Sequence, residues 1–344
     1  MADFTWIQQL AEVLNQRAFS SVVFLTDSHV DSLYSSYCAE LQSQVSCPMW
    51  KIVVPAGESS KSLSQVERVC TELLQLDCDR KACMVNFGGG MISDLGGFIA
   101  SVYKRGIAFV NYPTTLMAML DASIGGKTGV NLSQAKNMIG LVRQPLQVIG
   151  PDLFLLQTLP QEAILSGFGE MIKCALIGMP ALFDALEQLD VVEEAAIQRV
   201  WVEQCATLKQ EVVREDPEDY SYRHILNFGH TIGHAIESWR LATEQPIPHG
   251  VAVAEGIFYE TALSHRHSFL PAEEKSRIQR LIRKFYPPLD LQEGIGQILS
   301  YIQYDKKNHA DKINFTLLDA IGVARPDCLL DWQYCADCLS SQGQ

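Results

Sequence analysis

The fold of this chain is decided by the stretch Ala82-Cys83-Met84-Val85-Asn86-Phe87-Gly88-Gly89-Gly90. Residues 82–87 form a short apolar run typical of a buried strand, and the three glycines mark a tight turn into a helix. Further runs of this kind occupy residues 21–27, 49–55 and 107–112, and residues 61–78 have the spacing of an amphipathic helix. Strands that alternate with helices predict a parallel sheet covered on both faces.

The rest of the chain predicts a second, mainly α-helical domain. Its helical patterns cover residues 161–179, 180–215, 224–242, 249–266 and 271–285. A length of 344 residues suits two domains. We therefore predict an α/β domain over residues 1–158 and a helical domain over residues 159–344.

Composition excludes several classes of partner. Hydrophobic residues make up 47% of the chain and the formal net charge is −13, which disfavours nucleic acid and anionic membranes. We see no secretory leader and no run of roughly 18 apolar residues, so we expect a cytoplasmic protein whose ten cysteines are reduced. Cys335 and Cys338 form a lone CxxC; a structural zinc site normally needs a second such pair, so buried thiols are favoured and their role stays open.

Two loops at predicted strand ends indicate a nucleotide. The glycines of residues 88–90 would let backbone N–H groups approach phosphate at a helix N-terminus, although a tight turn alone explains them equally well. Asp27 ends the first strand, where an acidic side chain can accept a ribose hydroxyl or simply cap a helix.

A third segment indicates a phosphorylated ligand. Gly125-Gly126-Lys127-Thr128 resembles the end of a phosphate loop, but the first glycine of the GxxxxGK(S/T) pattern is absent, which rejects a Walker ATPase. Lys127, Lys136 and Asn137 still suit a phosphate in an otherwise acidic protein.

The strongest chemical signal is a candidate metal site. Asn227, His230 and His234 recur at helical spacing, and His249 opens the next predicted helix. Glu170 lies three residues before Lys173 on another helix. A catalytic zinc takes three imidazole or carboxylate ligands and keeps one position open. The spacing predicts a metal site but leaves the choice of histidines open.

Six motifs in this order resemble the 3-dehydroquinate synthase family. They occupy residues 88–94, 113–116, 121–131, 136–140, 169–173 and 226–234, and the match in order and spacing runs from about residue 20 to residue 325. The resemblance implies an N-terminal NAD-binding, Rossmann-like α/β domain, a helical metal- and substrate-binding domain, and an active site in the cleft between them.

The resemblance also implies roles for individual residues. The metal, zinc with cobalt as an alternative, would be bound by Glu170, His230 and His249. The residues implied to bind NAD are Asp27, Glu58, Lys61, Gly88, Gly89, Gly90, Asp94, Thr114, Thr115, Lys127, Lys136, Leu155 and Thr158. The residues implied to act on the substrate are Asp121, Lys127, Asn137, Lys173, Lys209, Arg223, Asn227 and His234, with Lys307 favoured over Lys306 for the phosphate. Arg105 resembles an arginine that reaches into the partner subunit, which implies a homodimer.

The implied activity is that of a lyase of the shikimate pathway of aromatic amino-acid biosynthesis. Such an enzyme converts 3-deoxy-D-arabino-heptulosonate 7-phosphate to 3-dehydroquinate and phosphate by transient oxidation with NAD, elimination, re-reduction and aldol closure. The alternatives are another sugar-phosphate cyclase of the valiolone or inosose type, a metal-dependent polyol dehydrogenase, and a non-catalytic nucleotide-binding protein. Ser93, Val251 and Glu255 depart from the family pattern, and we expect altered packing there.

Overall fold

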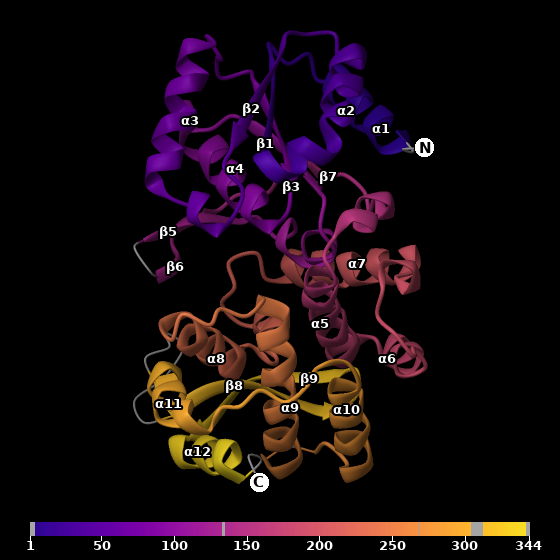
Figure 1. Ribbon diagram of the computed structural model, residues 1–344, viewed down its shortest axis with the longest axis vertical. Coiled ribbons are helices and arrows are strands. Elements are labelled where there is room, and N and C mark those ends of the chain that lie inside the picture. The colour runs from indigo at the N-terminus through magenta and orange to yellow at the C-terminus, as the bar shows by residue number, and fades with distance from the viewer. Residues whose placement is uncertain (1–3, 133–134, 268, 304–311, 342–344) are drawn as a thin grey trace. The chain divides into compact units, whose positions relative to one another are not determined.

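The computed structural model describes residues 4–132, 135–267, 269–303 and 312–341. The chain divides into two compact units, residues 1–159 and residues 160–344 (Figure 1).

The first unit is built on a five-stranded, wholly parallel sheet in the order β2-β1-β3-β4-β7. The strands are β1 (Val22–Asp27), β2 (Met49–Val54), β3 (Cys83–Gly88), β4 (Ala108–Pro113) and β7 (Gln147–Val148). The helices are α1 (Thr5–Gln16), α2 (Ser28–Gln44), α3 (Leu63–Gln75) and α4 (Gly90–Val102). Short helical turns are η1 (Glu58–Ser60), η2 (Tyr103–Arg105), η3 (Ala118–Ala122) and η4 (Leu153–Thr158).

Helices cover the sheet on both sides, α3 and α4 on one and α1 and α2 on the other (Figure 1). Successive side chains of a strand point to opposite faces, and both faces are buried. Val23 and Leu25 of β1 pack in the same core as Val69 of α3 and Leu95 of α4. Phe24, between them in the sequence, turns to the opposite face, where aromatic rings of α2, β3 and β4 gather. The predicted doubly covered parallel sheet is thereby confirmed.

A β-hairpin that the hydrophobic pattern does not indicate adjoins this sheet. β5 (Lys127–Leu132) and β6 (Ala135–Val142) pair antiparallel, and β5 contacts α4. Gly129 and Gly140 face each other in the hairpin, and a Cβ on Gly140 would lie 2.4 Å from the carbonyl oxygen of Thr128. The candidate phosphate-binding segment is therefore a hairpin and not a strand-to-helix loop.

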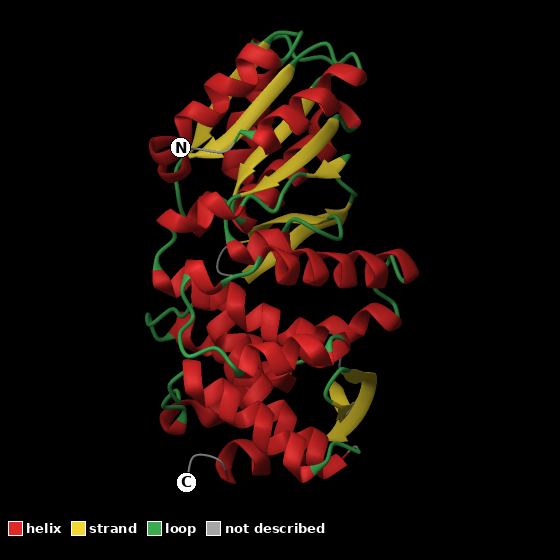
Figure 2. Cartoon of the chain, turned by 90° about the vertical axis from the view of Figure 1, so that its right-hand side faces the viewer, coloured by secondary structure: helices red, strands yellow, loops and turns green. Residues whose placement is uncertain are grey.

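The second unit is mainly helical, as predicted, with one two-stranded antiparallel hairpin (Figure 2). Its helices are α5 (Gln161–Gly178), α6 (Pro180–Glu187), α7 (Arg199–Glu215), α8 (His230–Ala242), α9 (His249–His267), α10 (Ala272–Phe285), α11 (Ile295–Gln303) and α12 (Trp332–Ser341). Short turns are η5 (Glu194–Ala196), η6 (Tyr222–Asn227) and η7 (Gln292–Gly294), and the hairpin is β8 (Lys312–Ala320) with β9 (Val323–Asp331).

The prediction of one long helix over residues 180–215 was wrong. Residues 180–215 form α6, the turn η5 and α7 in place of one long helix. Val192 and Ile197 in the connecting segment are both buried, and the carbonyl of Val192 accepts a hydrogen bond from the Gln161 side chain. The segment folds back onto α5 because this buries both apolar side chains, which overrides its local helical pattern.

The lone CxxC belongs to the core of this unit. Cys335 and Cys338 are buried among side chains of α8, α9 and β8, and Cys338 Sγ donates to the carbonyl of Tyr259 at 3.6 Å. Burial raises the pKa of both thiols, that of Cys338 to about 11. Both are packing residues that stay protonated.

Two of the departures from the family pattern have visible partners. Glu255 is 1% exposed and accepts two hydrogen bonds from Arg283 of α10, at 2.6 and 2.9 Å. Ser93, also buried, donates from Oγ to the carbonyl of Gly89, the N-cap residue of α4, at 3.3 Å. Among the helices described, none has the length and apolarity that a membrane crossing would need.

Candidate metal and cofactor sites

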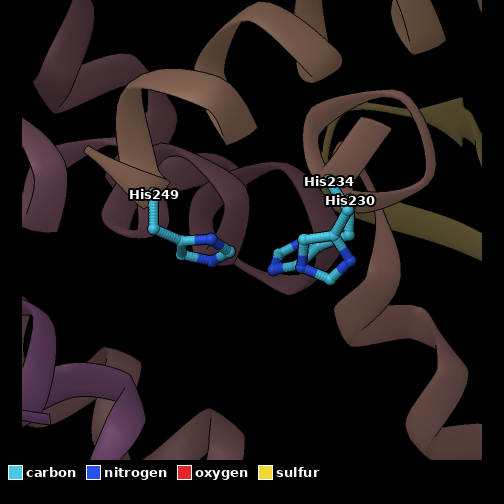
Figure 3. Close-up of side chains that lie close together, drawn as sticks. All are labelled: His230, His234 and His249. Carbon is cyan, nitrogen blue, oxygen red and sulfur yellow. The ribbon is translucent and has the colours of Figure 1, made fainter. Parts of the chain in front are cut away.

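Three helices of the second unit bring a carboxylate and three imidazoles together. Glu170 lies in the middle of α5, and His230 and His249 are the first residues of α8 and α9. Figure 3 shows the rings of His230, His234 and His249 beside one another, with ring centroids 5.1 to 5.5 Å apart. The nitrogen atoms that these histidines offer lie within 4.8 Å of one another.

Glu170 is positioned between two of these rings. Its side chain is fully buried, and Oε1 lies 3.3 Å from Nε2 of His230 and 3.3 Å from Nε2 of His249. Oε2 pairs with Lys173 Nζ at 2.5 Å. A buried carboxylate oxygen between two imidazole nitrogens is stabilised by a cation, either a proton on Nε2 or a metal ion.

The outer nitrogens of both histidines are already engaged. His230 Nδ1 donates to the Phe228 carbonyl at 3.2 Å, and His249 Nδ1 donates to Glu237 Oε2 at 3.0 Å. These bonds place a proton on each Nδ1 and direct Nε2 of both rings at Glu170 Oε1, where a bound metal would take the place of any proton on Nε2. Three potential ligand atoms therefore converge on one point, which is how a protein presents a divalent metal with its ligands.

The charged groups around the site also favour a bound cation. Burial opposes a charged His249, but the carboxylates of Glu170 and Glu237 outweigh it and raise the pKa of His249 to about 10. Burial opposes the ionised form of Glu170 too, yet Lys173 and His230 hold its pKa well below the ordinary value. Burial, followed by repulsion from Lys173, lowers the pKa of His230. The donor set thus fits a metal such as zinc or cobalt.

Glycines allow the helices to approach closely enough for this convergence. Gly169 precedes Glu170 and Gly250 follows His249, and α5 and α9 touch at these two residues. A Cβ on Gly250 would lie 1.7 Å from the carbonyl oxygen of Ser166, and one on Gly169 would lie 2.3 Å from the Gly250 carbonyl oxygen. Any side chain at either position would push α5 and α9 apart, and with them Glu170 and His249.

The other implied substrate residues of this unit surround the same helices. Lys173 on α5 and Lys209 on α7 are buried, and Arg223 on η6 is 3% exposed. Asn227 ends η6 and is half-buried, while His234 is exposed. Arg223 Nη1 donates to the Pro217 carbonyl at 3.0 Å. These cations supply local positive charge in an acidic protein.

In the first unit, a cavity of about 300 Å³ opens at the carboxyl ends of the strands. Its lining includes eight of the residues implied to bind NAD: Asp27, Glu58, Gly89, Gly90, Thr114, Thr115, Leu155 and Thr158. Asp27 Oδ1 caps α2 by accepting from the amides of His29 and Val30, at 2.9 and 3.0 Å. The two interpretations of Asp27 are therefore compatible, because one oxygen serves the helix and the side chain still lines the cavity.

A buried lysine connects this region to the β5–β6 hairpin. Lys61 Nζ lies 2.6 Å from Asp94 Oδ2 and also donates to Asn137 Oδ1. Asn137 has a φ of 56°, in the left-handed region. Asn131 accepts from the Asn137 amide and donates to Glu58, each at 2.9 Å. Three residues implied to bind NAD and one implied to bind the substrate thus share one network.

The remaining implied residues of this unit lie in the hairpin, in short helical turns and at the end of β3. Lys127 and Lys136 are exposed on the hairpin, and Asp121 is half-buried in η3. Arg105 is exposed in η2, and Gly88 ends β3 just before the cavity. Lys306 and Lys307 lie outside the described residues.

Sequence reasoning missed several residues that support these sites. Glu237 orients His249, and its place seven residues after His230, on the same helix face, is a signal that could have identified it. Asp216 accepts the backbone amides of Tyr220, Ser221 and Arg223, at 2.8 to 3.1 Å. Asp152 accepts from the hydroxyls of Tyr37 and Tyr112, at 3.1 and 2.9 Å, just before η4. The sequence carried no signal for Asp152.

Known proteins resemble this chain over most of its length. Residues 51–166 match the family model of the 3-dehydroquinate synthase N-terminal domain, and residues 167–308 match that of the C-terminal domain. A 3-dehydroquinate synthase of Parabacteroides distasonis is 36% identical over 320 residues, which are 92% of this chain and 90% of that protein.

Solved structures of other proteins have the same fold over most of this chain. A 2-deoxy-scyllo-inosose synthase complexed with carbaglucose-6-phosphate, NAD⁺ and Co²⁺ has a TM-score of 0.86 at 25% identity, covering 98% of this chain and 94% of that one. A 2-epi-5-epi-valiolone synthase of Streptomyces hygroscopicus subsp. jinggangensis 5008, with NAD⁺ and Zn²⁺ bound, has a TM-score of 0.81 at 26% identity, covering 94% and 91%. The resemblance drawn from the six motifs is confirmed: the chain belongs to the 3-dehydroquinate synthase family.

Proposed function

We propose that this chain converts 3-deoxy-D-arabino-heptulosonate 7-phosphate to 3-dehydroquinate and phosphate, as an NAD- and metal-dependent lyase. Membership of the family supports this reaction. The observation that carries it is the Glu170 carboxylate buried between the Nε2 atoms of His230 and His249. Three potential ligand atoms held together in a buried place suit a bound cation.

We propose Glu170, His230 and His249 as the ligands of one divalent metal. When bound, zinc or cobalt would supply Lewis-acid activation of a substrate hydroxyl. Glu237 would keep the His249 ring in the tautomer that presents Nε2. His234 would face the substrate and hydrogen-bond to it.

We propose the cavity of the first unit as the site of NAD, the hydride acceptor. Asp27 would accept a ribose hydroxyl, and the glycines at the start of α4 would present amides to the pyrophosphate. Thr114, Thr115, Leu155 and Thr158 complete the lining. Glu58, Lys61, Asp94, Lys127 and Lys136 would contribute charge and hydrogen bonds around it.

The substrate would be held by cationic and amide side chains. Lys127, Asn137, Arg223 and a lysine of the 306–307 pair would bind the phosphate through charge-assisted hydrogen bonds. Lys173, Lys209 and Asn227 would orient the hydroxyls, and Asp121 would complete the substrate contacts. The elements that carry these residues would be the determinants of affinity for the sugar phosphate.

We further propose a cytoplasmic homodimer. Ten cysteines without a disulfide support a reducing compartment. Arg105 is exposed in η2 and so is available to a second copy of the chain.

Phosphate release tests the reaction. The purified protein, supplied with catalytic NAD and zinc, should release phosphate from the heptulosonate phosphate without net accumulation of NADH. Steady accumulation of NADH would identify a polyol dehydrogenase. Release from sedoheptulose 7-phosphate or glucose 6-phosphate alone would identify another sugar-phosphate cyclase and contradict the proposal.

A further inference from the structure

Helix α8 begins without a cap of its own. The residue at its N-cap position is Gly229, which has a φ of 80° and no side chain to accept a hydrogen bond. The first amides of a helix have no partner within the helix, and a Ser, Thr, Asp or Asn at the cap normally accepts one of them. Because His230 is the first residue of α8, the unprotected turn carries a proposed metal ligand.

Glu260 of α9 replaces the missing cap. Its Oε2 accepts from the amide of Gly229 at 2.6 Å, and its Oε1 accepts from the amide of Ile232 at 2.9 Å. These two amides lie on either side of His230 in the sequence. Glu260 is 0% exposed, so water cannot take its place. One side chain thus holds the backbone of His230 from both sides.

The ionised carboxylate is the chemical form that fits this place. Each of its two oxygens receives an N–H, and the amides belong to the positive end of the α8 dipole. A glutamine would direct its own N–H₂ toward one of these N–H groups and could satisfy only the other. The site therefore distinguishes Glu from its closest uncharged analogue.

Close packing of α8 against α9 restricts the position of His230. A Cβ on Gly256 of α9 would lie 2.0 Å from the carbonyl oxygen of Gly229 and 2.7 Å from the amide nitrogen of Gly233. The two backbones are therefore in direct contact beside the first turn of α8. A change in the bonds of Glu260 is transmitted to the position of His230.

We propose that Glu260 is a positioning residue of the metal site, which fixes His230 through the N-terminus of α8. The inference rests on the proposed function, since that function makes His230 a ligand. It gives α9 two tasks, because this helix supplies His249 at its own first residue and orients His230 from a residue three turns later.

Cobalt binding tests this role independently of turnover. Metal-free full-length protein and its Glu260→Gln variant would be titrated with Co²⁺ alone, and the visible absorption of the bound ion would be recorded. We expect affinity to fall about 10- to 100-fold in the variant, with an altered spectrum, because loss of a residue that orients a ligand has this size of effect. Hydrogen exchange at Gly229 or Ile232 should also become faster.

Glu255→Gln is the matched control. Glu255 lies on the same helix and is 1% exposed, but its carboxylate pairs with Arg283 of α10 and not with α8. Its substitution should lower the unfolding temperature while cobalt affinity and spectrum stay those of the wild type. This separates the positioning of His230 from a general loss of stability.

Wild-type cobalt affinity and spectrum in Glu260→Gln would overturn the inference, as would an equal loss of affinity in Glu255→Gln. Should Glu260→Gln fail to fold, Glu260→Asp keeps the charge on a side chain one methylene shorter. We expect it to bind cobalt with intermediate affinity, and wild-type affinity there would contradict the proposed role. Absence of cobalt binding by the wild-type protein would contradict the proposed metal site and this inference with it.

Discussion

The proposed metal site of the second unit depends on one atom, Oε1 of Glu170. This oxygen faces Nε2 of two imidazole rings, and the other oxygen of Glu170 already pairs with Lys173. The pKa of His249 rises to about 10, against the effect of burial, because Glu170 and Glu237 surround it. Such a site binds a cation, either a proton or a metal, and a divalent metal neutralises more of its charge.

The identity of the ligands can be tested at single residues. We predict that His249→Ala and Glu170→Gln lose bound zinc, measured by elemental analysis after gel filtration, because each removes one of the three converging donors. His234→Ala should keep its zinc and lose activity, since His234 is assigned to the substrate. Full zinc occupancy in His249→Ala, or zinc loss in His234→Ala alone, would contradict the assignment.

Among the elements, the turn that precedes η6 depends on a single carboxylate. Asp216 accepts three backbone amides, including that of Arg223, and its hydrogen bond from Ser221 contributes most to lowering its pKa to about 2. The ordinary value is 3.8. A depressed folded-state pKa means that this contribution to stability is complete above the ordinary value and disappears as the pH falls through the folded-state value.

We therefore predict a pH-dependent difference between wild type and Asp216→Asn. The variant should be less stable near neutral pH, and the gap in the urea midpoint should close as the pH falls from about 5 to about 2, where the wild-type carboxylate becomes protonated. A gap that stays constant over this range would show that the charge of Asp216 does not stabilise the turn.

The close approach of α5 and α9 at Gly169 and Gly250 leads to another prediction at the level of whole elements. We predict that Gly250→Ala lowers the free energy of unfolding by about 1–3 kcal/mol, the usual size of an overpacking effect. Zinc affinity should fall as well, because Glu170 and His249 move apart with their helices. Gly296→Ala is the control in urea unfolding and zinc titration, since a Cβ there meets nothing within 4 Å. Equal behaviour of the two variants would contradict this account.

At the scale of the whole molecule, the proposed exchange of Arg105 between subunits makes a prediction about mixtures. Arg105→Ala and His249→Ala should each be inactive alone. Subunits mixed, unfolded and refolded together should recover about a quarter of wild-type activity, because half of the random dimers would then contain one complete site. If Arg105 acted within its own subunit, no dimer would contain a complete site and the mixture would stay inactive.

The sequence predicted the central strands of the sheet correctly. The first four strands of the sheet agree with prediction to within a residue at each end, because fully buried parallel strands have continuous apolar sequences. The hairpins β5–β6 and β8–β9 were missed, since alternation in them is interrupted by glycines and by irregular register. The break between α6 and α7 was missed because burial of Val192 and Ile197 is decided by α5, which is distant in the sequence.

By itself, the sequence determined the class of the fold, the family, and the residue types that could bind a metal, NAD and phosphate, because periodicity and motif spacing are local properties. Tertiary structure decided which atoms meet. It placed Glu170 Oε1 at 3.3 Å from two Nε2 atoms, and it brought Glu237 to His249 and Glu260 to the start of α8. These contacts join three different helices, and no local pattern encodes the packing that sets their separation.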